Sequence, residues 1–287
     1  MSTASLHSLI HDLREHVPPS DDLIEGLARV GYGARGFVYL SAGALTLLAA
    51  MNRGGEAMTS SGAIGWLAQQ PFGRVWLLLL GLGLCGFVAW RVVQAVLDAD
   101  HHGNDMKGIL GRIGMGASGL AYGLLAVTVF GYLDLFGVPD PGSDGQQAAE
   151  NRDRAEALLA LPMGQWLLVG VGLAVLAMGV GNMFRAWHDD FGETLGCPPD
   201  LCRKLTPLAR AGYGARGFAY LPLAAFVILA GLQSQAARVT SLGEALDAMQ
   251  RQPGGSWMLG LTAVGLMAFG AFAFVEARWR KIRPPRV

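Results

Sequence analysis

Arginine and tyrosine recur at a fixed spacing in this sequence. The pattern Arg-x-x-Tyr-x-x-Arg-Gly-x-x-Tyr occurs twice with every position kept, at Arg29, Tyr32, Arg35 and Tyr39 and again at Arg210, Tyr213, Arg216 and Tyr220. A weaker copy keeps Arg112 and Tyr122 but has Met115 and Ser118 at the other two positions. Guanidinium groups bind carboxylates and phosphates through paired hydrogen bonds. The pattern therefore predicts a site for a small anion or a lipid headgroup.

The same residues also have a purely structural interpretation. On a helix with 3.6 residues per turn, Arg29, Tyr32 and Tyr39 lie on one face together with Gly36. Glycine permits close helix packing, tyrosine anchors a helix at the membrane interface, and arginine marks the cytoplasmic boundary. If the three faces instead meet around a common axis, they form a cationic, tyrosine-lined vestibule at the cytoplasmic mouth. The sequence leaves both interpretations open.

Six apolar runs must position these side chains. Each is close to the roughly 20 residues that span a bilayer, and each is apolar on all faces, which is not typical of a soluble helix. We expect an all-α polytopic membrane protein with six transmembrane helices, at about Leu27–Met51, Val75–Leu97, Ile113–Phe136, Met163–Trp187, Arg210–Leu232 and Trp257–Trp279.

The basic residues predict the orientation of these helices. Of the 22 Lys and Arg residues, sixteen fall on the side that holds both termini, and six fall on the other: Arg53, Arg74, Arg152, Arg154, Arg238 and Arg251. Positive charge gathers on the cytoplasmic side of membrane proteins. We therefore expect a multi-pass membrane protein with both termini in the cytoplasm. The formal net charge of zero gives no reason to expect a nucleic-acid partner.

The chain divides into repeats. We expect an N-terminal cytoplasmic arm with a short amphipathic helix at 1–26, three helical hairpins at 27–103, 104–196 and 197–282, and a basic tail at 283–287. Each hairpin crosses the membrane twice, so the three units are parallel and are predicted to be related by a pseudo-threefold axis. Proline and glycine precede the second helix of each hairpin, at Pro71, Pro162 and Pro253.

The repeated motif, at Ala28–Gly36 and Ala209–Gly217, resembles that of the bacterial membrane family catalogued as domain of unknown function 1206. The resemblance covers nearly the whole chain, from about residue 25 to residue 280, with a degenerate middle copy. It implies three tandem transmembrane helix pairs and a bacterial origin, so that the membrane would be the bacterial inner membrane. It implies no established activity.

Charged residues also close the second helix of each hairpin. Arg91 and Arg185 stand at two of these positions and Glu276 at the third. We expect a structural ion pair that joins Glu276 to one of four arginines, Arg29, Arg91, Arg185 or Arg210. The alternative is an acid that relays protons.

No residue pattern predicts a catalytic, metal or cofactor site. None of the six histidines lies in a charge-free membrane segment, as paired haem ligands would, and Cys197 and Cys202 have no metal-ligand spacing and are expected to be reduced. We therefore expect a non-enzymatic protein in the bilayer: either a binding protein that engages an anionic ligand or lipid headgroup at its cytoplasmic arginine and tyrosine face, or an accessory protein that joins a larger membrane assembly through its glycine-rich helix faces. The alternative is a small-molecule or ion transporter that uses the pseudo-threefold axis.

Overall fold

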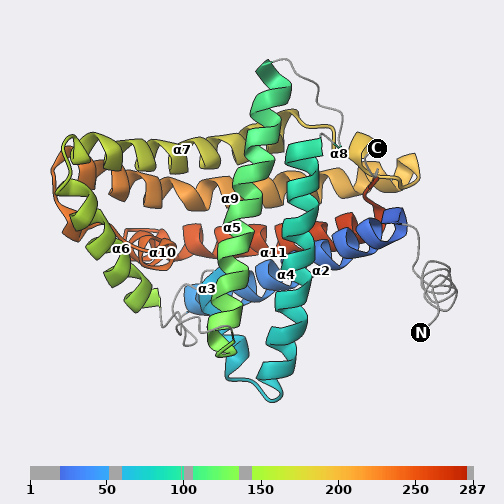
Figure 1. Cartoon of the computed structure of the whole chain (residues 1–287), viewed down its shortest axis with the longest axis horizontal. Helices are drawn as coiled ribbons and strands as arrows, with labels where there is room; N and C mark the ends of the chain where they lie inside the picture. The colour runs from blue at the N-terminus through green and yellow to red at the C-terminus, as the bar shows by residue number, and fades with distance from the viewer. Residues whose placement is uncertain (1–19, 52–59, 98, 100–105, 136–143, 283–287) are drawn as a thin grey trace, which may run out of the picture.

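The computed structural model describes residues 20–51, 60–97, 99, 106–135 and 144–282. Within these ranges the regular structure is helical, apart from one isolated bridge between Leu195 and Arg280 (Figure 1). The predicted N-terminal arm up to residue 19 and the basic tail at 283–287 lie outside the described residues. The elements are α2 (Ser20–Ala50), α3 (Ser60–Ala68), α4 (Gly73–Leu97), α5 (Met106–Tyr132), α6 (Asp144–Leu159), α7 (Gly164–His188), α8 (Phe191–Thr194), α9 (Pro199–Leu232), η1 (Ala236–Arg238), α10 (Leu242–Gln250) and α11 (Gly255–Trp279).

Six of these helices are long and apolar enough to cross a membrane. They are α2, α4, α5, α7, α9 and α11, and their apolar spans run from 25 to 34 residues. This confirms the predicted all-α fold with six candidate transmembrane helices. A shorter helix, α3, α6 or α10, precedes the second long helix of each repeat.

The second long helix of each repeat begins in the same way. The residue after the repeated proline has a left-handed backbone, with φ of 61° at Phe72, 62° at Met163 and 76° at Gly254. The next residue is glycine each time, because a Cβ there would overlap a carbonyl oxygen at the end of the preceding short helix; these residues are Gly73, Gly164 and Gly255. The repeated Pro-x-Gly sequence thus sets a sharp turn between the short and the long helix.

The most extensive helix pairs join different repeats: the first to the second, the second to the third, and the third back to the first. They are α4 with α5, α7 with α9, and α11 with α2. Glycine permits this closeness, because a Cβ on Gly36 of α2 would lie 2.9 Å from the carbonyl oxygen of Gly270 of α11. The α9–α7 pair repeats the arrangement with Gly217 and Gly179, where the corresponding distance is 2.6 Å.

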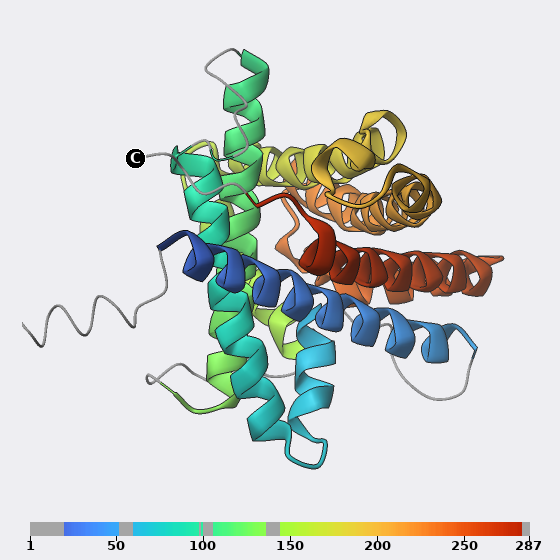
Figure 2. The same cartoon turned by 90° about the vertical axis from the view of Figure 1, so that its right-hand side faces the viewer.

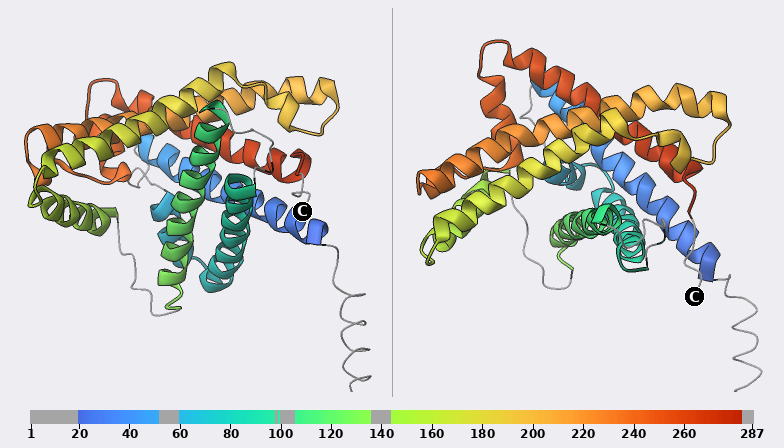
Figure 3. Two further views of the ribbon diagram at one scale, coloured as in Figure 1. Left: turned by 45° about the horizontal axis from the view of Figure 1, so that its top comes forward. Right: turned by 90° about the horizontal axis from the view of Figure 1, so that it is seen from above.

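The predicted pseudo-threefold symmetry is not confirmed. Helices α7, α9, α11 and α2 lie side by side in one layer, whereas the α4–α5 pair runs across the face of that layer (Figures 1 and 2). Seen from above, α4 and α5 are nearly end-on while the other four are viewed from the side (Figure 3). The crossing point of the two layers lies near the middle of the long helices.

The middle repeat is open, which explains the loss of symmetry. In the outer repeats, a Cβ on Gly31 of α2 would lie 2.6 Å from the backbone of Phe87, and one on Gly212 of α9 would lie 2.5 Å from the backbone of Phe269. Gly114 holds the same motif position in α5, and it has no neighbouring atom within 4 Å. Over their described residues, α5 and α7 make no extensive contact.

Candidate functional site

The first arginine of the motif binds the end of a neighbouring helix. Arg29 Nη1 donates to the carbonyl oxygens of Ala277 and Arg278 at 2.9 and 2.8 Å, at the end of α11. Arg112 does the same at the end of α4, where its Nε and Nη2 reach the carbonyl oxygens of Ala95 and Val96 at 2.8 and 2.9 Å. A cation at a helix C-terminus is stabilised by the helix dipole and by the free carbonyl groups.

These contacts give the first arginines a structural role in two of the three helix pairs. Arg29 also pairs with Glu25 on its own helix, 2.6 Å away. Arg210, the third member of the set, is exposed on α9. The predicted vestibule therefore does not draw Arg29, Arg112 and Arg210 together around one opening.

The second arginine of the motif lies at the centre of the molecule. Arg35 is 1% exposed near the midpoint of α2, and the partly buried Arg216 holds the same place in α9. Their guanidinium carbons lie 4.3 and 4.8 Å from the centre of the Phe269 ring. Such cation–π contacts partly replace the water that a buried cation has lost. The middle copy has Ser118 at this position.

Two phenylalanine rings organise the tyrosines around these arginines. Phe87 of α4 contacts Tyr32 and Tyr122 edge-on, with ring centres 5.2 and 4.7 Å apart. Phe269 of α11 contacts Tyr213 and Tyr39 edge-on, at 5.0 and 4.8 Å. The fifth motif tyrosine, Tyr220, lies beside Arg216, whose guanidinium carbon is 5.9 Å from the ring. The tyrosines are thus packed inside the crossing point rather than anchored at an interface.

Glu276 supplies a buried carboxylate to this region. It is 2% exposed, its Oε1 lies 2.7 Å from Arg280 Nη1, and its Oε2 lies 3.5 Å from Arg35 Nη1. Glu276 therefore forms ion pairs, but with different partners from the four arginines named from the sequence. Arg91 instead donates to the side-chain oxygen of Gln94 at 3.0 Å and lies over the Phe87 ring, and Arg185 is exposed near the end of α7.

We call this group the arginine–tyrosine cluster; its members are Arg35, Arg91, Arg216, Arg280, Glu276, Tyr32, Tyr39, Tyr122, Tyr213 and Tyr220. It holds four guanidinium groups and one carboxylate. Several buried polar atoms of the cluster have no hydrogen-bond partner: the Nε of Arg35, Arg91 and Arg216, and the hydroxyl groups of Tyr32 and Tyr122. Buried polar atoms are normally paired. Among the residues that the structure describes, the cluster thus combines excess positive charge with unused hydrogen-bonding capacity.

A pocket of about 310 Å³ opens onto the cluster from the end of the molecule that holds the termini. It is lined by Arg91, Tyr213, Glu276 and Arg280 of the cluster and also by Arg185, so the three residues predicted to close the second helices do meet there. Other charged side chains at its rim are Asp189, Glu193 and Lys281. Partial burial raises the pKa of the Asp189 carboxyl, and the nearby Arg185 and His188 offset part of that rise.

The segment around α8 covers one side of this pocket. Phe191 stacks on Tyr213, with ring centres 5.3 Å apart, and it meets Phe272 edge-on at 5.5 Å. The amide of Gly196 donates to the carbonyl oxygen of Trp279 at 2.6 Å, which ties the segment to the end of α11.

The two cysteines in this region differ from expectation. Cys197 and Cys202 were expected to be reduced, whereas the structure joins them in a disulfide between the α8 segment and the first turn of α9. Their Cα atoms are 5.7 Å apart, within the usual range for a disulfide. The helical turn that begins at Pro199 brings the two side chains together.

Sequence reasoning missed Arg280, Phe87 and Phe269 as members or supports of this site. Arg280 follows Glu276 by one helical turn, a spacing that favours an ion pair. Phe87 and Phe269 stand at the same distance along the chain from Gly73 and Gly255, so an alignment on these glycines reveals them. Among the described residues, no group of three His, Cys, Asp or Glu is arranged to hold a metal ion. His7, His11, His16, His101 and His102 lie outside the described residues.

Comparison of the sequence with known proteins identifies the family of this chain. The model of the family described as Domain of Unknown Function (DUF1206) matches residues 30–98, 113–189 and 211–280. The uncharacterized protein YxxB of Bacillus subtilis (strain 168) is 30% identical over 257 residues, which covers 88% of this chain and 90% of that protein. No solved structure matches the chain. Three matched segments, each of which contains one of the helix pairs, show that the chain belongs to the DUF1206 family.

Proposed function

We propose that this membrane protein is a non-enzymatic binding protein that holds an anion, either a small solute or the headgroup of a lipid, at the arginine–tyrosine cluster. One observation carries the proposal: four guanidinium groups and a single carboxylate share the interior where the helix layers cross. A cation buried at membrane depth is costly unless it is paired, and such residues mark binding sites and ion pathways.

The site has the geometry to accept an anion at its pocket end. Arg91 and Tyr213 reach the pocket from α4 and α9, and the Nε of Arg91 has no partner. A phosphate or carboxylate in the pocket can accept hydrogen bonds from the arginine donors, which are stronger when both groups are charged. Phe191 and Tyr213 form part of the pocket wall, and the low polarity of their rings strengthens this attraction.

Ligand-dependent stability tests the proposal. We would measure the thermal unfolding of the full-length protein in detergent with increasing inorganic phosphate, and in nanodiscs of phosphatidylglycerol or phosphatidylcholine. A ligand that binds only the folded state raises its stability, by about 2.7 kcal/mol at a concentration one hundred times Kd. Stabilisation by phosphate points to a soluble anion, whereas stabilisation only by phosphatidylglycerol points to a lipid headgroup. Equal stability in all conditions contradicts the proposal.

Paired variants assign the effect to the cluster. Arg91→Gln removes one pocket arginine and is expected to weaken binding about tenfold, which is the effect of one charge-assisted hydrogen bond. Arg203→Gln, an exposed arginine at the start of α9, is the matched control and should bind as the wild type does. If both variants bind equally, the arginine–tyrosine cluster is not the site.

The orientation follows from the charge distribution and is part of the proposal. Both termini and the pocket would face the cytoplasm of a bacterial cell, at its inner membrane. In that reducing compartment the Cys197–Cys202 disulfide would be converted to two thiols. Reporter domains fused after Asn52, Ser143 and Gln235 should then report the outside. A cytoplasmic signal from any of the three fusions would overturn this topology.

Transport of the anion is a second candidate, favoured by the depth of Arg35 and Arg216 near the middle of their helices. Charged residues at this depth occur in transport pathways. Phosphate flux into proteoliposomes distinguishes the two functions, because a binding or accessory protein leaves the flux at the level of empty liposomes. Native mass spectrometry of the same sample would reveal a larger membrane assembly through co-purified chains.

A further inference from the structure

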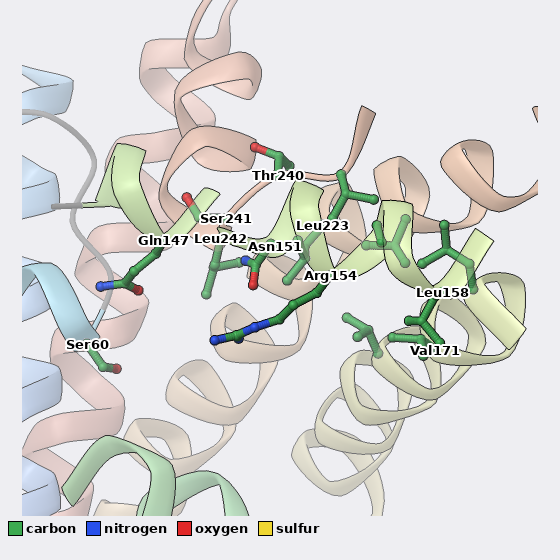
Figure 4. Close-up of a pocket in the computed structure, with 15 residues that line it drawn as sticks. Ser60, Gln147, Asn151, Arg154, Leu158, Val171, Leu223, Thr240, Ser241 and Leu242 are labelled. Carbon is green, nitrogen blue, oxygen red and sulfur yellow. The ribbon is translucent and has the colours of Figure 1, made fainter. Parts of the chain in front are cut away.

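A second pocket, of about 400 Å³, lies between α6, α7 and α9 (Figure 4). It is near the end of the long helices at which α7 begins and α9 ends, as the path of these helices in Figure 1 shows. Its lining has two parts. Gln147, Asn151 and Arg154 extend from α6 on one side, and Leu158 and Val171 lie on the other side (Figure 4). A pocket with separate polar and apolar parts fits an amphiphilic ligand.

The polar part is a single stripe of α6. Gln147, Asn151, Arg154 and Leu158 are spaced three or four residues apart, so they project from one face of the helix. Both amide side chains are half-buried, and neither hydrogen-bonds to another of the described residues. These amides are therefore available to a ligand.

The helix that carries this stripe is held firmly in place. Arg152 on another face of α6 donates to the carbonyl oxygen of Val239 at 3.1 Å and pairs with Glu244 of α10 at 2.7 Å. Ser241 caps α10 by accepting a hydrogen bond from the backbone of Glu244. Because α6, η1 and α10 are linked in this way, the polar wall is preorganised rather than formed on binding.

The apolar part has a length that suits an acyl chain. It follows α7 from Leu168 to Val175, and Leu223 and Val227 of α9 line the facing wall. At 1.5 Å per residue the α7 wall extends about 10 Å into the bundle, roughly two thirds of the ~15 Å hydrocarbon thickness of one leaflet. A lipid chain can therefore lie along it from the membrane surface inward.

The charges favour one class of headgroup. Arg154 is the one charged side chain in the described lining, and no Asp or Glu is part of it. Arg154 pairs with Glu150 on its own helix at 2.9 Å, and both side chains are more than half exposed, so this pair is weak and can be exchanged. The lining thus offers a partner to a phosphate and none to an ammonium group.

We propose that this pocket binds an anionic glycerophospholipid of the leaflet at that end, with its phosphate at Arg154, its glycerol oxygens at Asn151 and Gln147, and one acyl chain along α7 and α9. This site is separate from the arginine–tyrosine cluster and does not depend on the function proposed there.

Native mass spectrometry of the full-length protein, titrated in detergent with phosphatidylglycerol or phosphatidylethanolamine, tests the proposal. We expect phosphatidylglycerol to bind the wild type about tenfold more tightly than phosphatidylethanolamine, because the ammonium group of phosphatidylethanolamine finds no carboxylate in the described lining and competes with Arg154 for the phosphate. Arg154→Gln should remove this preference, whereas Arg238→Gln, an exposed arginine at the same end and outside the lining, should keep it.

A second variant tests the acyl-chain wall independently of charge. Val171 is 47% exposed and faces the pocket, so Val171→Trp fills the groove without disturbing the core. It should weaken binding of phosphatidylglycerol at least as much as Arg154→Gln does. Equal affinity for the two lipids in the wild type, or unchanged phosphatidylglycerol binding in both variants, would overturn the proposal.

Discussion

Replacing Glu276 by Gln is the sharpest test of how the arginine–tyrosine cluster is stabilised. The substitution keeps the size and shape of the side chain and removes the one carboxylate of the cluster, which contacts two of its four arginines. Glu276 lies 2.7 Å from Arg280 and 3.5 Å from Arg35, and its side chain is 3% exposed. Little water can therefore reach this site to stabilise the arginines once the carboxylate charge is removed.

The magnitude follows from these two ion pairs. At an effective dielectric constant of about 20, two unit charges 3–4 Å apart attract by roughly 4–5 kcal/mol, and desolvation of the partners offsets much of this. Removing one partner leaves the other charge buried and uncompensated, which costs about 3–5 kcal/mol. We expect Glu276→Gln to lower the free energy of unfolding by that amount.

Reversible unfolding in mixed detergent micelles, followed by tryptophan fluorescence, measures this change. Glu193→Gln is the control, since Glu193 is exposed at the rim of the same pocket and should change stability by less than about 0.5 kcal/mol. The double variant Glu276→Gln/Arg35→Gln should be more stable than the sum of the two single effects, by about 0.5–3 kcal/mol. A Glu276→Gln protein as stable as the control would refute the reasoning, because the arginines would then not depend on this carboxylate.

Two further predictions concern helix packing and pH. Gly31→Ala should destabilise the protein by about 1–3 kcal/mol, because its Cβ would meet the Phe87 backbone at 2.6 Å. Gly114→Ala, with no atom within 4 Å of its Cβ, should be neutral or stabilising by up to about 1 kcal/mol in the same unfolding assay. Equal effects of the two substitutions would contradict the open middle repeat. Burial raises the pKa of Asp189, so the folded state favours the neutral carboxyl. This favourable effect on the free energy of unfolding is fully present below the unfolded pKa of about 3.9, and it is lost as the pH rises through the folded pKa. Asp189→Asn should therefore gain stability relative to the wild type between about pH 4 and pH 7, and a difference that does not change with pH would argue against this burial effect.

The sequence was sufficient to predict the helices and the family. Apolar runs long enough to span a bilayer are a strong signal, because a helix in lipid must satisfy its own backbone hydrogen bonds. The repeated motif at Ala28–Gly36 and Ala209–Gly217 was equally informative, since two nearly identical copies in one chain require two similar structural units. These signals are local and need no knowledge of which helices touch.

The placement of the motif side chains could not be predicted in the same way. Helical periodicity indicates that Arg29, Tyr32 and Tyr39 share a face, but it does not indicate what that face meets. In the structure, Arg29 donates hydrogen bonds to carbonyl groups at the end of α11, whereas Arg35 is buried in the interior of the molecule. The partners that decide these roles, Phe87 and Phe269, lie on other helices far along the sequence.

The degenerate middle copy explains why the cluster belongs to the two outer repeats. Met178 of α7 stands at the same distance from Gly164 as Phe87 does from Gly73, and it is 45% exposed where Phe87 is fully buried. Position 178 has no aromatic ring, and Met115 and Ser118 stand in place of the motif tyrosine and arginine. Over the described residues of α5 and α7, no cation–π or edge-on contact therefore joins the two helices. The middle repeat instead contributes Tyr122 to the Phe87 ring from outside its own hairpin. The same substitutions that weaken the repeat in the sequence thus open the middle hairpin, and the excess positive charge gathers on the outer repeats around Phe87 and Phe269.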